Sequence, residues 1–272
     1  MIQIKDMTIG FIGTGKMGEA LIRGIISAGL VEPGRICASD IDERKLAMLG
    51  EDLGIVVSCD NAQTIEKADV VILAVKPQII RYVLQGIKES AIKKHLFISI
   101  AAGVNIESLA NELPGGTRVV RVMPNICATV GEAASAICPG DAATKTDVET
   151  TRKILEAVGR TVVVDEHLMD AVTGLSGSGP AFVFMIIEAL ADGGVHQGLD
   201  RVTAQTLAAQ TVLGAARMVL ESGKHPGELK DMVTSPAGTT IRGIEALEKR
   251  KVRAAVMSAV IAASERSREL GK

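Results

Sequence analysis

The chain has 272 residues and a formal net charge of −2; 47% of it is hydrophobic, and its aromatic residues are one Tyr, four Phe and no Trp. This length suits one large or two medium domains, whereas the near-neutral charge and the few aromatic rings argue against nucleic acid as a partner. The longest apolar runs are too short to cross a membrane, the first residues do not form a secretory signal, and the scattered cysteines do not suit a metal site. We therefore expect a cytoplasmic protein with no bound metal and no membrane contact.

The first part of the chain alternates between strand and helix patterns. We expect strands just before residue 13 and over residues 35–40, 54–58, 70–75, 96–100, 118–123 and 134–137. Helices are expected over residues 19–27, 42–53, 61–67 and 78–90. Every residue of 70–75 is apolar, as in the central strand of a parallel sheet that helices cover on both faces. Repeated strand–helix units of this kind predict a doubly wound α/β sheet.

Residues 13–18, Gly-Thr-Gly-Lys-Met-Gly, have the glycine spacing of a dinucleotide-binding turn between a strand and a helix. Gly13 permits the tight turn, Gly15 lets a pyrophosphate approach the backbone, and Gly18 lets the helix pack closely. The segment also fits most of an ATP-binding P-loop, but Met17 stands where that loop needs a hydroxyl for Mg²⁺. We therefore predict a Rossmann-type dinucleotide-binding domain over residues 1–164. Its turn supplies the candidate cofactor-binding residues Gly13, Thr14, Gly15, Lys16, Met17 and Gly18.

Asp40 ends the second expected strand about 20 residues after Gly18, where a carboxylate can bind the ribose 2′-hydroxyl of NAD. Arg44 and Lys45 follow and could instead hold the 2′-phosphate of NADP. Asp40 and Asp42 could equally be helix-capping residues. The residues therefore leave both NADH and NADPH open as the cofactor.

The strand over residues 70–75 ends at the edge of the sheet where nucleotides bind, and its last residues and their neighbours are Ala74, Val75, Lys76 and Pro77. Lys76 could be an ordinary surface lysine, but its position favours a role beside the cofactor, and it is a candidate catalytic residue. Residues 101–103 and 123–125 close later strands in the same way. Their loops, with Ala102 and Gly103, are expected to line the nicotinamide half of the site.

From about residue 165 the strand patterns stop, and alanine-rich helix patterns cover residues 180–192, 201–221, 238–248 and 252–270. The segment 181–187 is apolar all round, so it belongs either in a core or against another subunit. A helical domain over residues 165–272 is thin for burying several such faces. We therefore expect an all-α second domain that binds substrate and forms an intertwined homo-oligomer.

Two further segments of this domain are unusual. Residues 174–180, Gly-Leu-Ser-Gly-Ser-Gly-Pro, do not fit the nucleophile elbow of a serine hydrolase, and we expect them to give close backbone packing against another subunit. Residues 234–240 place hydroxyls, glycine and free N–H groups at the start of an expected helix, which suits a substrate carboxylate. An ordinary Ser/Thr cap is the alternative interpretation of this second segment.

Along nearly its whole length the sequence resembles the Δ1-pyrroline-5-carboxylate reductase family. The matching segments are GFIGTGKMGEAL (10–21), AVKPQ (74–78), AAG (101–103), RVMPN (121–125), GLSGSGPAF (174–182), ADGG (191–194) and HPGELKDMVTSPAGTTI (225–241). The resemblance implies NAD(P)H-dependent reduction of the cyclic imine pyrroline-5-carboxylate to L-proline. It also implies a Rossmann domain, a C-terminal helical dimerisation domain, and homodimers that often assemble into larger rings such as decamers.

By position, the resemblance assigns Ser235 and the N–H groups of Gly238 and Thr239 to the substrate carboxylate, and Thr240 to the ring nitrogen. A protonated imine is already electrophilic, so hydride transfer needs positioning more than a strong base, and Thr240 is a candidate proton donor. The family often binds NADP through a serine and a downstream basic residue. Ser39 matches that pattern, and Asp40 departs from it.

Two other functions fit parts of the sequence. The β-hydroxyacid dehydrogenases share the N-terminal pattern and a helical second domain, but they use a lysine followed four residues later by an asparagine, and residues 165–272 lack that spacing. A non-catalytic dinucleotide sensor would have no use for the polar segment 234–240.

Overall fold

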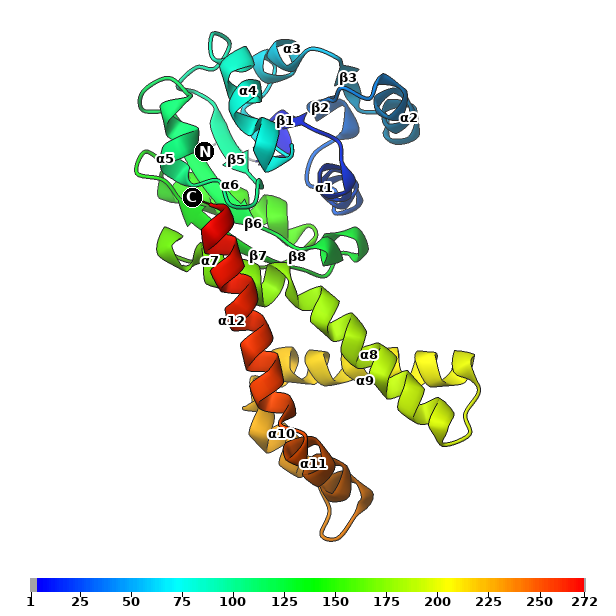
Figure 1. The fold of residues 1–272 in the computed structure, drawn as a ribbon. Coiled ribbons are helices and arrows are strands. Elements are labelled where there is room, and N and C mark those ends of the chain that lie inside the picture. Colours follow the sequence, from blue (N-terminus) through cyan, green and yellow to red (C-terminus); the bar gives the residue numbers. More distant parts are fainter. Residues whose placement is uncertain (1–3, 272) are drawn as a thin grey trace. The chain divides into compact units, whose positions relative to one another are not determined.

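Eight strands form one sheet in the order β3-β2-β1-β4-β5-β6-β7-β8 (Figure 1). The strands are β1 (Ile9–Ile12), β2 (Ile36–Ser39), β3 (Val56–Ser58), β4 (Val70–Leu73), β5 (Leu96–Ser99), β6 (Arg118–Met123), β7 (Ala133–Pro139) and β8 (Gly159–Val163). Neighbouring strands run parallel except β6 and β7, which pair antiparallel. From β1 the chain first builds β2 and β3 on one side and then crosses to β4 on the other. This computed structural model, which describes residues 4–271, confirms the predicted α/β Rossmann-type sheet.

Helices cover both faces of the sheet. On one face lie α1 (Lys16–Ser27), α2 (Glu43–Leu53) and α6 (Lys145–Glu156), and on the other lie α3 (Asn61–Glu66), α4 (Pro77–Ile87) and α5 (Ile106–Asn111). In β4, Val70 and Ile72 belong to the core on the first face, and Val71 and Leu73 belong to the core on the second. Because alternate residues of a strand point to opposite faces, β4 has to be apolar throughout. The central position predicted for this strand is confirmed.

Two α-helices and one strand between residues 101 and 163 have no counterpart among the predicted elements: α5, α6 and β8. α5 has six residues, too few to show a helical period. α6 opens with a capping box between Thr144 and Asp147, a signal that the sequence did contain. β8 lacks an apolar run because its residues are partly or fully exposed at the edge of the sheet.

The rest of the chain is helical, as predicted, and no strand follows Val163 in the part that the structure describes. The elements are α7 (Met169–Val172), α8 (Gly179–His196), α9 (Arg201–Ser222), α10 (Pro226–Met232), α11 (Thr239–Lys249) and α12 (Val252–Leu270). By contacts, the chain divides into a first unit, Met1–Ser178 with Ala262–Lys272, and a second unit, Gly179–Ile261. The last turns of α12 thus belong to the first unit. The domain boundary between residues 164 and 165 stays a prediction.

The apolar segment 181–187 lies in α8 and is largely uncovered within this chain. Phe184 is 60% exposed and Met185 is 66% exposed. α8 packs on α9 around the small buried side chains of Ala191, Ala204 and Ala208, and Ile187 and Val195 are partly buried against them. An uncovered apolar face of this size needs a covering partner, which fits the expected homo-oligomer.

One helical stretch of the described chain, Glu166–His196, is long and apolar enough to cross a membrane. A single stretch that passes a test of length and composition is weak evidence for a membrane span, because helices of soluble proteins pass it too.

Candidate active site

The turn after β1 has the geometry predicted for its glycines. Gly13 has a φ of +98°, and a Cβ at this residue would lie 2.7 Å from the carbonyl oxygen of Ala74. A Cβ at Gly18 would lie 2.4 Å from the carbonyl oxygen of Gly13. The ideal Cβ position of Gly15, in contrast, has no atom within 4 Å. The fold itself therefore requires Gly13 and Gly18, whereas the space beside Gly15 is open to a ligand.

α1 begins at this turn without a side-chain cap. Gly15 is the N-cap residue, with φ −58° and ψ −178°, and no side chain accepts a hydrogen bond from the first turn of the helix. The amides of Lys16, Met17 and Gly18 are therefore unpaired in the chain as described, at the positive end of the helix. A Cβ at Gly15 would fill this cradle. The residues present thus fit the pyrophosphate of a dinucleotide.

The end of β2 is bound to the same turn. The Asp40 carboxylate accepts hydrogen bonds from the Thr14 N–H (2.6 Å) and from the Thr14 hydroxyl (2.8 Å). Burial raises the pKa of Asp40, but the hydrogen bonds to Thr14 and to nearby backbone amides outweigh it and hold the pKa below its usual value. The N-cap of α2 is Asp42, which accepts a hydrogen bond from the Lys45 N–H. Of the two candidate capping residues, only Asp42 caps the helix.

The loop after β4 lies directly beside the glycine turn. The Ala74 N–H donates to the Ile12 carbonyl at 2.8 Å, and a Cβ at Gly13 would contact both Ala74 and Val75. Lys76 is the N-cap residue of α4 and Pro77 is the first residue of that helix. The Lys76 side chain is exposed, and among residues 4–271 it has no hydrogen bond or ion pair.

A hollow of about 650 Å³ lies within the first unit, next to the loops after β4 and β5. The residues that line it include Pro77, Gln78, Ala102, Gly103, Thr173, Ser178, Arg266 and Ser267. Ser267 is buried and its hydroxyl donates to the Asp170 carboxylate at 2.7 Å, which ties the end of α12 to α7. The predicted residues Pro77, Ala102 and Gly103 therefore meet at one hollow, whereas Lys76 does not line it.

Residues 173–177 form a π-helical turn, Thr173–Gly177, just before α8. The Asn125 side chain donates to the Ser176 carbonyl at 3.0 Å, and a Cβ at Gly177 would lie 2.7 Å from the Cε of Met123. Within this chain the segment packs closely on the end of β6 and on the loop after it, and the predicted packing against another subunit stays a prediction. Turns of this type are frequent at functional sites, and this one brings Thr173 and Ser178 to the hollow.

In the second unit, residues 234–240 form a tight turn that leads into α11. Ala237 has a φ of +57°, a left-handed conformation that non-glycine residues seldom adopt. Gly238 is the N-cap residue of α11 and no side chain caps the helix, so the interpretation of this segment as a Ser/Thr cap is wrong. The Gly238 N–H donates to the Ser235 carbonyl at 3.1 Å. The amides of Thr239 and Thr240 have no partner in the described part of the chain, and unpaired amides at a helix start are groups that can attract an anion.

The chain matches known proteins over both units. A family model described as pyrroline-5-carboxylate reductase dimerisation matches residues 166–270, and a model described as NADP oxidoreductase, coenzyme F420-dependent, matches residues 8–103. The chain is 60% identical to a pyrroline-5-carboxylate reductase of Methanosarcina acetivorans, over 99% of this chain and 100% of that protein. This chain belongs to the pyrroline-5-carboxylate reductase family.

Solved reductases of this family have the same fold. The structure of the pyrroline-5-carboxylate reductase from Coxiella burnetii is 38% identical, with a TM-score of 0.93 over 98% of this chain and 99% of that one. The Plasmodium falciparum pyrroline carboxylate reductase, solved with NADP bound, is 33% identical, with a TM-score of 0.87 over 99% of this chain and 100% of that one. The likeness therefore covers the Rossmann sheet and the helical domain together.

One predicted cofactor-binding residue of this reductase already has a hydrogen-bond partner within the chain. The Ser39 side chain is fully buried, and its hydroxyl donates to the Asn61 side-chain oxygen at 2.7 Å. A cofactor phosphate could use this hydroxyl only if it left Asn61. The sequence shows a serine at the end of β2 but does not reveal which way its side chain points.

Most residues that line the hollow were not predicted from the sequence, among them Thr173, Ser178, Arg266 and Ser267. The segment around Thr173 and Ser178 was recognised as unusual and assigned to packing. Nothing in the pattern of α12 indicates that its last turns return to the Rossmann sheet of the reductase.

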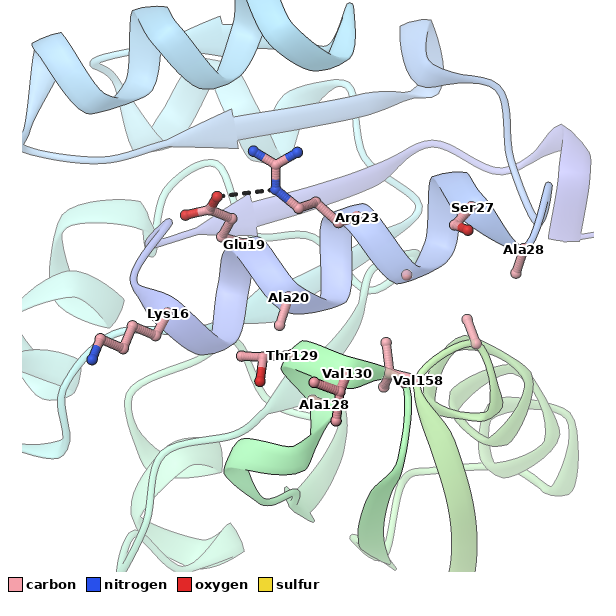
Figure 2. Close-up of a pocket in the computed structure, with 13 residues that line it drawn as sticks. Lys16, Glu19, Ala20, Arg23, Ser27, Ala28, Ala128, Thr129, Val130 and Val158 are labelled. Atoms are coloured by element: carbon pink, nitrogen blue, oxygen red, sulfur yellow. Dashed lines mark hydrogen bonds and ion pairs between the residues drawn. The ribbon is translucent and has the colours of Figure 1, made fainter. Parts of the chain in front are cut away.

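A second hollow of about 640 Å³ runs along α1 (Figure 2). Ala20 points toward Thr129 and Val130, while Glu19 and Arg23 form an ion pair of 3.0 Å on another side of the helix. This hollow follows the flank of α1 and not the carboxyl ends of the strands, where ligands of such sheets bind. We assign no substrate to it.

Proposed function

We propose that this chain reduces 1-pyrroline-5-carboxylate to L-proline with NADH or NADPH. The observation that carries the proposal is the uncapped start of α11 behind the Ala237 turn, in a chain whose first unit holds a dinucleotide cradle. A dinucleotide sensor needs only the cradle. A reductase of an anionic substrate needs the second anion site as well.

The geometry of the first unit supports the proposed cofactor roles. The unpaired amides at the start of α1 would hold the pyrophosphate, with Gly15 leaving the space and Gly13 and Gly18 allowing the tight turn. Asp40 would face the adenine ribose. The nicotinamide side would be formed by Ala74, Val75, Lys76, Pro77, Ala102 and Gly103. When bound, the reduced cofactor supplies a hydride.

We assign the proposed substrate roles to residues 234–240, the turn that leads into α11. The Ser235 hydroxyl and the Thr239 amide would hold the carboxylate of the substrate, and Thr240 would face its ring nitrogen. The Gly238 amide can join them only if it releases the Ser235 carbonyl, to which it now donates. The open amides and the helix dipole both favour an anion here, so the carboxylate would fix the orientation of the ring.

The chemistry needs little beyond this orientation. The hydride adds to the carbon of the C=N bond, and the electron pair of that bond moves to the nitrogen. A protonated imine already carries the proton that the product amine needs. A neutral imine would take one from the Thr240 hydroxyl or from water, and Lys76 is the candidate catalytic cation on the cofactor side.

The test is direct. The purified protein is incubated with pyrroline-5-carboxylate and either NADH or NADPH, while cofactor oxidation is followed by absorbance and proline is quantified. We expect one proline for each cofactor oxidised. Cofactor oxidation without proline, or none with either cofactor, would refute the proposed function.

We propose a homodimer formed through residues 165–272 and, as in the resemblance, a ring of dimers such as a decamer in the cytoplasm. The exposed apolar residues of α8 support a subunit contact there. Light scattering on the purified protein measures the mass, and a stable monomer at micromolar concentration would refute this assembly.

A further inference from the structure

The side chains around the end of β2 form a connected network on the glycine turn. Asp40 Oδ2 accepts from the Thr14 N–H and hydroxyl, and Asp40 Oδ1 accepts from the Asp42 N–H at 3.1 Å. The carboxylate is thereby held at the carboxyl end of β2 by backbone that belongs to the cofactor cradle. These hydrogen bonds favour the ionised form, since the pKa of Asp40 is lowered despite its partial burial.

The groups that could bind a 2′-phosphate at this place are mostly engaged elsewhere. The Ser39 hydroxyl is buried and donates to Asn61. The Lys45 ammonium donates to the Thr14 carbonyl and pairs with Glu19 at 3.3 Å. A phosphate would have to compete with both partners for this lysine.

The other cation beside Lys45 is compensated as well. Arg23 pairs with Glu19 at 3.0 Å and with Asp52 at 2.8 Å, and the first of these ion pairs is drawn in Figure 2. In the first turn of α2, Arg44 is the remaining cation, and its exposed side chain has no hydrogen bond or ion pair among the described residues. The fixed negative charge of Asp40 thus stands on the glycine turn, where the exposed side chains of Arg44 and of Lys16 are the cations without a hydrogen bond or ion pair among the described residues.

The geometry points to Asp40 as the residue that makes this enzyme prefer NADH over NADPH. The carboxylate accepts a hydrogen bond from the ribose 2′-hydroxyl of NADH, whereas the 2′-phosphate of NADPH brings a second anion to the same place. The repulsion between two charges a few ångströms apart is reduced by water and salt but not abolished at a partly buried site. The inference rests on the proposed function only where it concerns the reduction step, because the preference for NADH can also be measured as cofactor binding without substrate.

The experiment compares Asp40→Asn with Asp42→Asn in the full-length protein. Both substitutions remove one acidic charge without changing side-chain size, and asparagine is as good an N-cap as aspartate, so α2 keeps its cap in the control. Dissociation constants for NADH and NADPH are measured by fluorescence titration without substrate. The ratio of kcat/KM for the two cofactors is measured with pyrroline-5-carboxylate.

We expect the unmodified protein to bind NADH at least about tenfold more tightly than NADPH, and Asp40→Asn to move that ratio by about tenfold or more toward NADPH. Asp42→Asn should leave the ratio within about twofold, since its charge serves the helix cap. Adding Arg44→Ala to Asp40→Asn should remove any gain in NADPH binding that depends on this arginine.

Tighter binding of NADPH by the unmodified protein would overturn the inference, and so would an equal shift in both single variants. If Asp40→Asn does not fold, Asp40→Ser takes its place with Asp42→Ser as the control, because serine also caps helices. A protein that prefers NADH in the titration but forms no proline would refute the proposed function and leave the role of Asp40 intact.

Discussion

Gly15→Ala separates the role of the glycine turn in folding from its role in binding. The ideal Cβ of Gly15 meets no atom within 4 Å, and its φ of −58° and ψ of −178° are accessible to alanine. Alanine is a poorer N-cap than glycine, so we expect a loss of at most about 1 kcal/mol in the free energy of unfolding. The methyl group of the alanine would, however, occupy the open space beside residue 15, where we propose that the pyrophosphate binds. We expect cofactor affinity to fall at least about tenfold, or about 1.4 kcal/mol.

Gly13→Ala, in contrast, should mainly destabilise the fold. At Gly13 the φ of +98° strains any side chain, and the new Cβ would lie 2.7 Å from the Ala74 carbonyl oxygen. We expect this variant to lose about 2 kcal/mol or more of stability, because neither the strain nor the backbone contact is easily relieved. Gly13→Ala should therefore lower the free energy of unfolding, and any loss of cofactor affinity would follow from that loss of stability.

Both variants are assayed by urea unfolding and by fluorescence titration of the reduced cofactor. Gly86→Ala is the matched control: its Cβ also meets nothing within 4 Å, but it lies near the end of α4, away from the cradle. It should bind cofactor normally and be slightly more stable, since alanine is the better helix former. Normal cofactor affinity in a folded Gly15→Ala protein would refute the assignment of the cradle.

Three further predictions concern other parts of the chain. Thr240→Ala should lower kcat at least about tenfold, which corresponds to about 1.4 kcal/mol of transition-state stabilisation. Thr240→Ser keeps the hydroxyl and should retain most of the original kcat. Equal kcat values for the two variants in steady-state kinetics would show that the hydroxyl takes no part in the mechanism. Ala237→Val should raise the KM for the imine several-fold, because a β-branched side chain tolerates the φ of +57° poorly, whereas Ala237→Gly should leave the KM nearly unchanged. A valine variant with a normal KM would show that this turn does not position the substrate. His95 is fully buried, and burial lowers its pKa below 6.5. The charges of Lys94 and Arg118 lower this pKa further, whereas Asp69 raises it by a smaller amount than burial lowers it. The unfolded chain therefore binds this proton first as the pH falls below about 6.5, so stability should decline there. His95→Asn should flatten that decline in urea midpoints measured across this range, and an unchanged slope would assign it to other groups.

The local patterns of the sequence predicted much of the fold because each depends on neighbouring residues. The apolar run of β4 reflects burial on both faces, and the glycine spacing after β1 reflects a turn and a close contact within six residues. α5 and β8 were missed because a six-residue helix and an exposed edge strand carry weak periodicity. The capping box of α6 was present and could have been recognised.

The features of the candidate site also fall into two groups, those set by local sequence and those set by long-range packing. The sequence by itself determined the dinucleotide turn, the polar start of α11 and the family, since these are written in short segments with strict backbone requirements. Only the tertiary structure decided that Asp40 accepts hydrogen bonds from Thr14, that the Ser39 hydroxyl donates to Asn61, and that Ser267 of α12 donates to Asp170. Those contacts join residues 22 to 97 positions apart. Side-chain direction and long-range packing fix them, and neither is encoded in a local pattern.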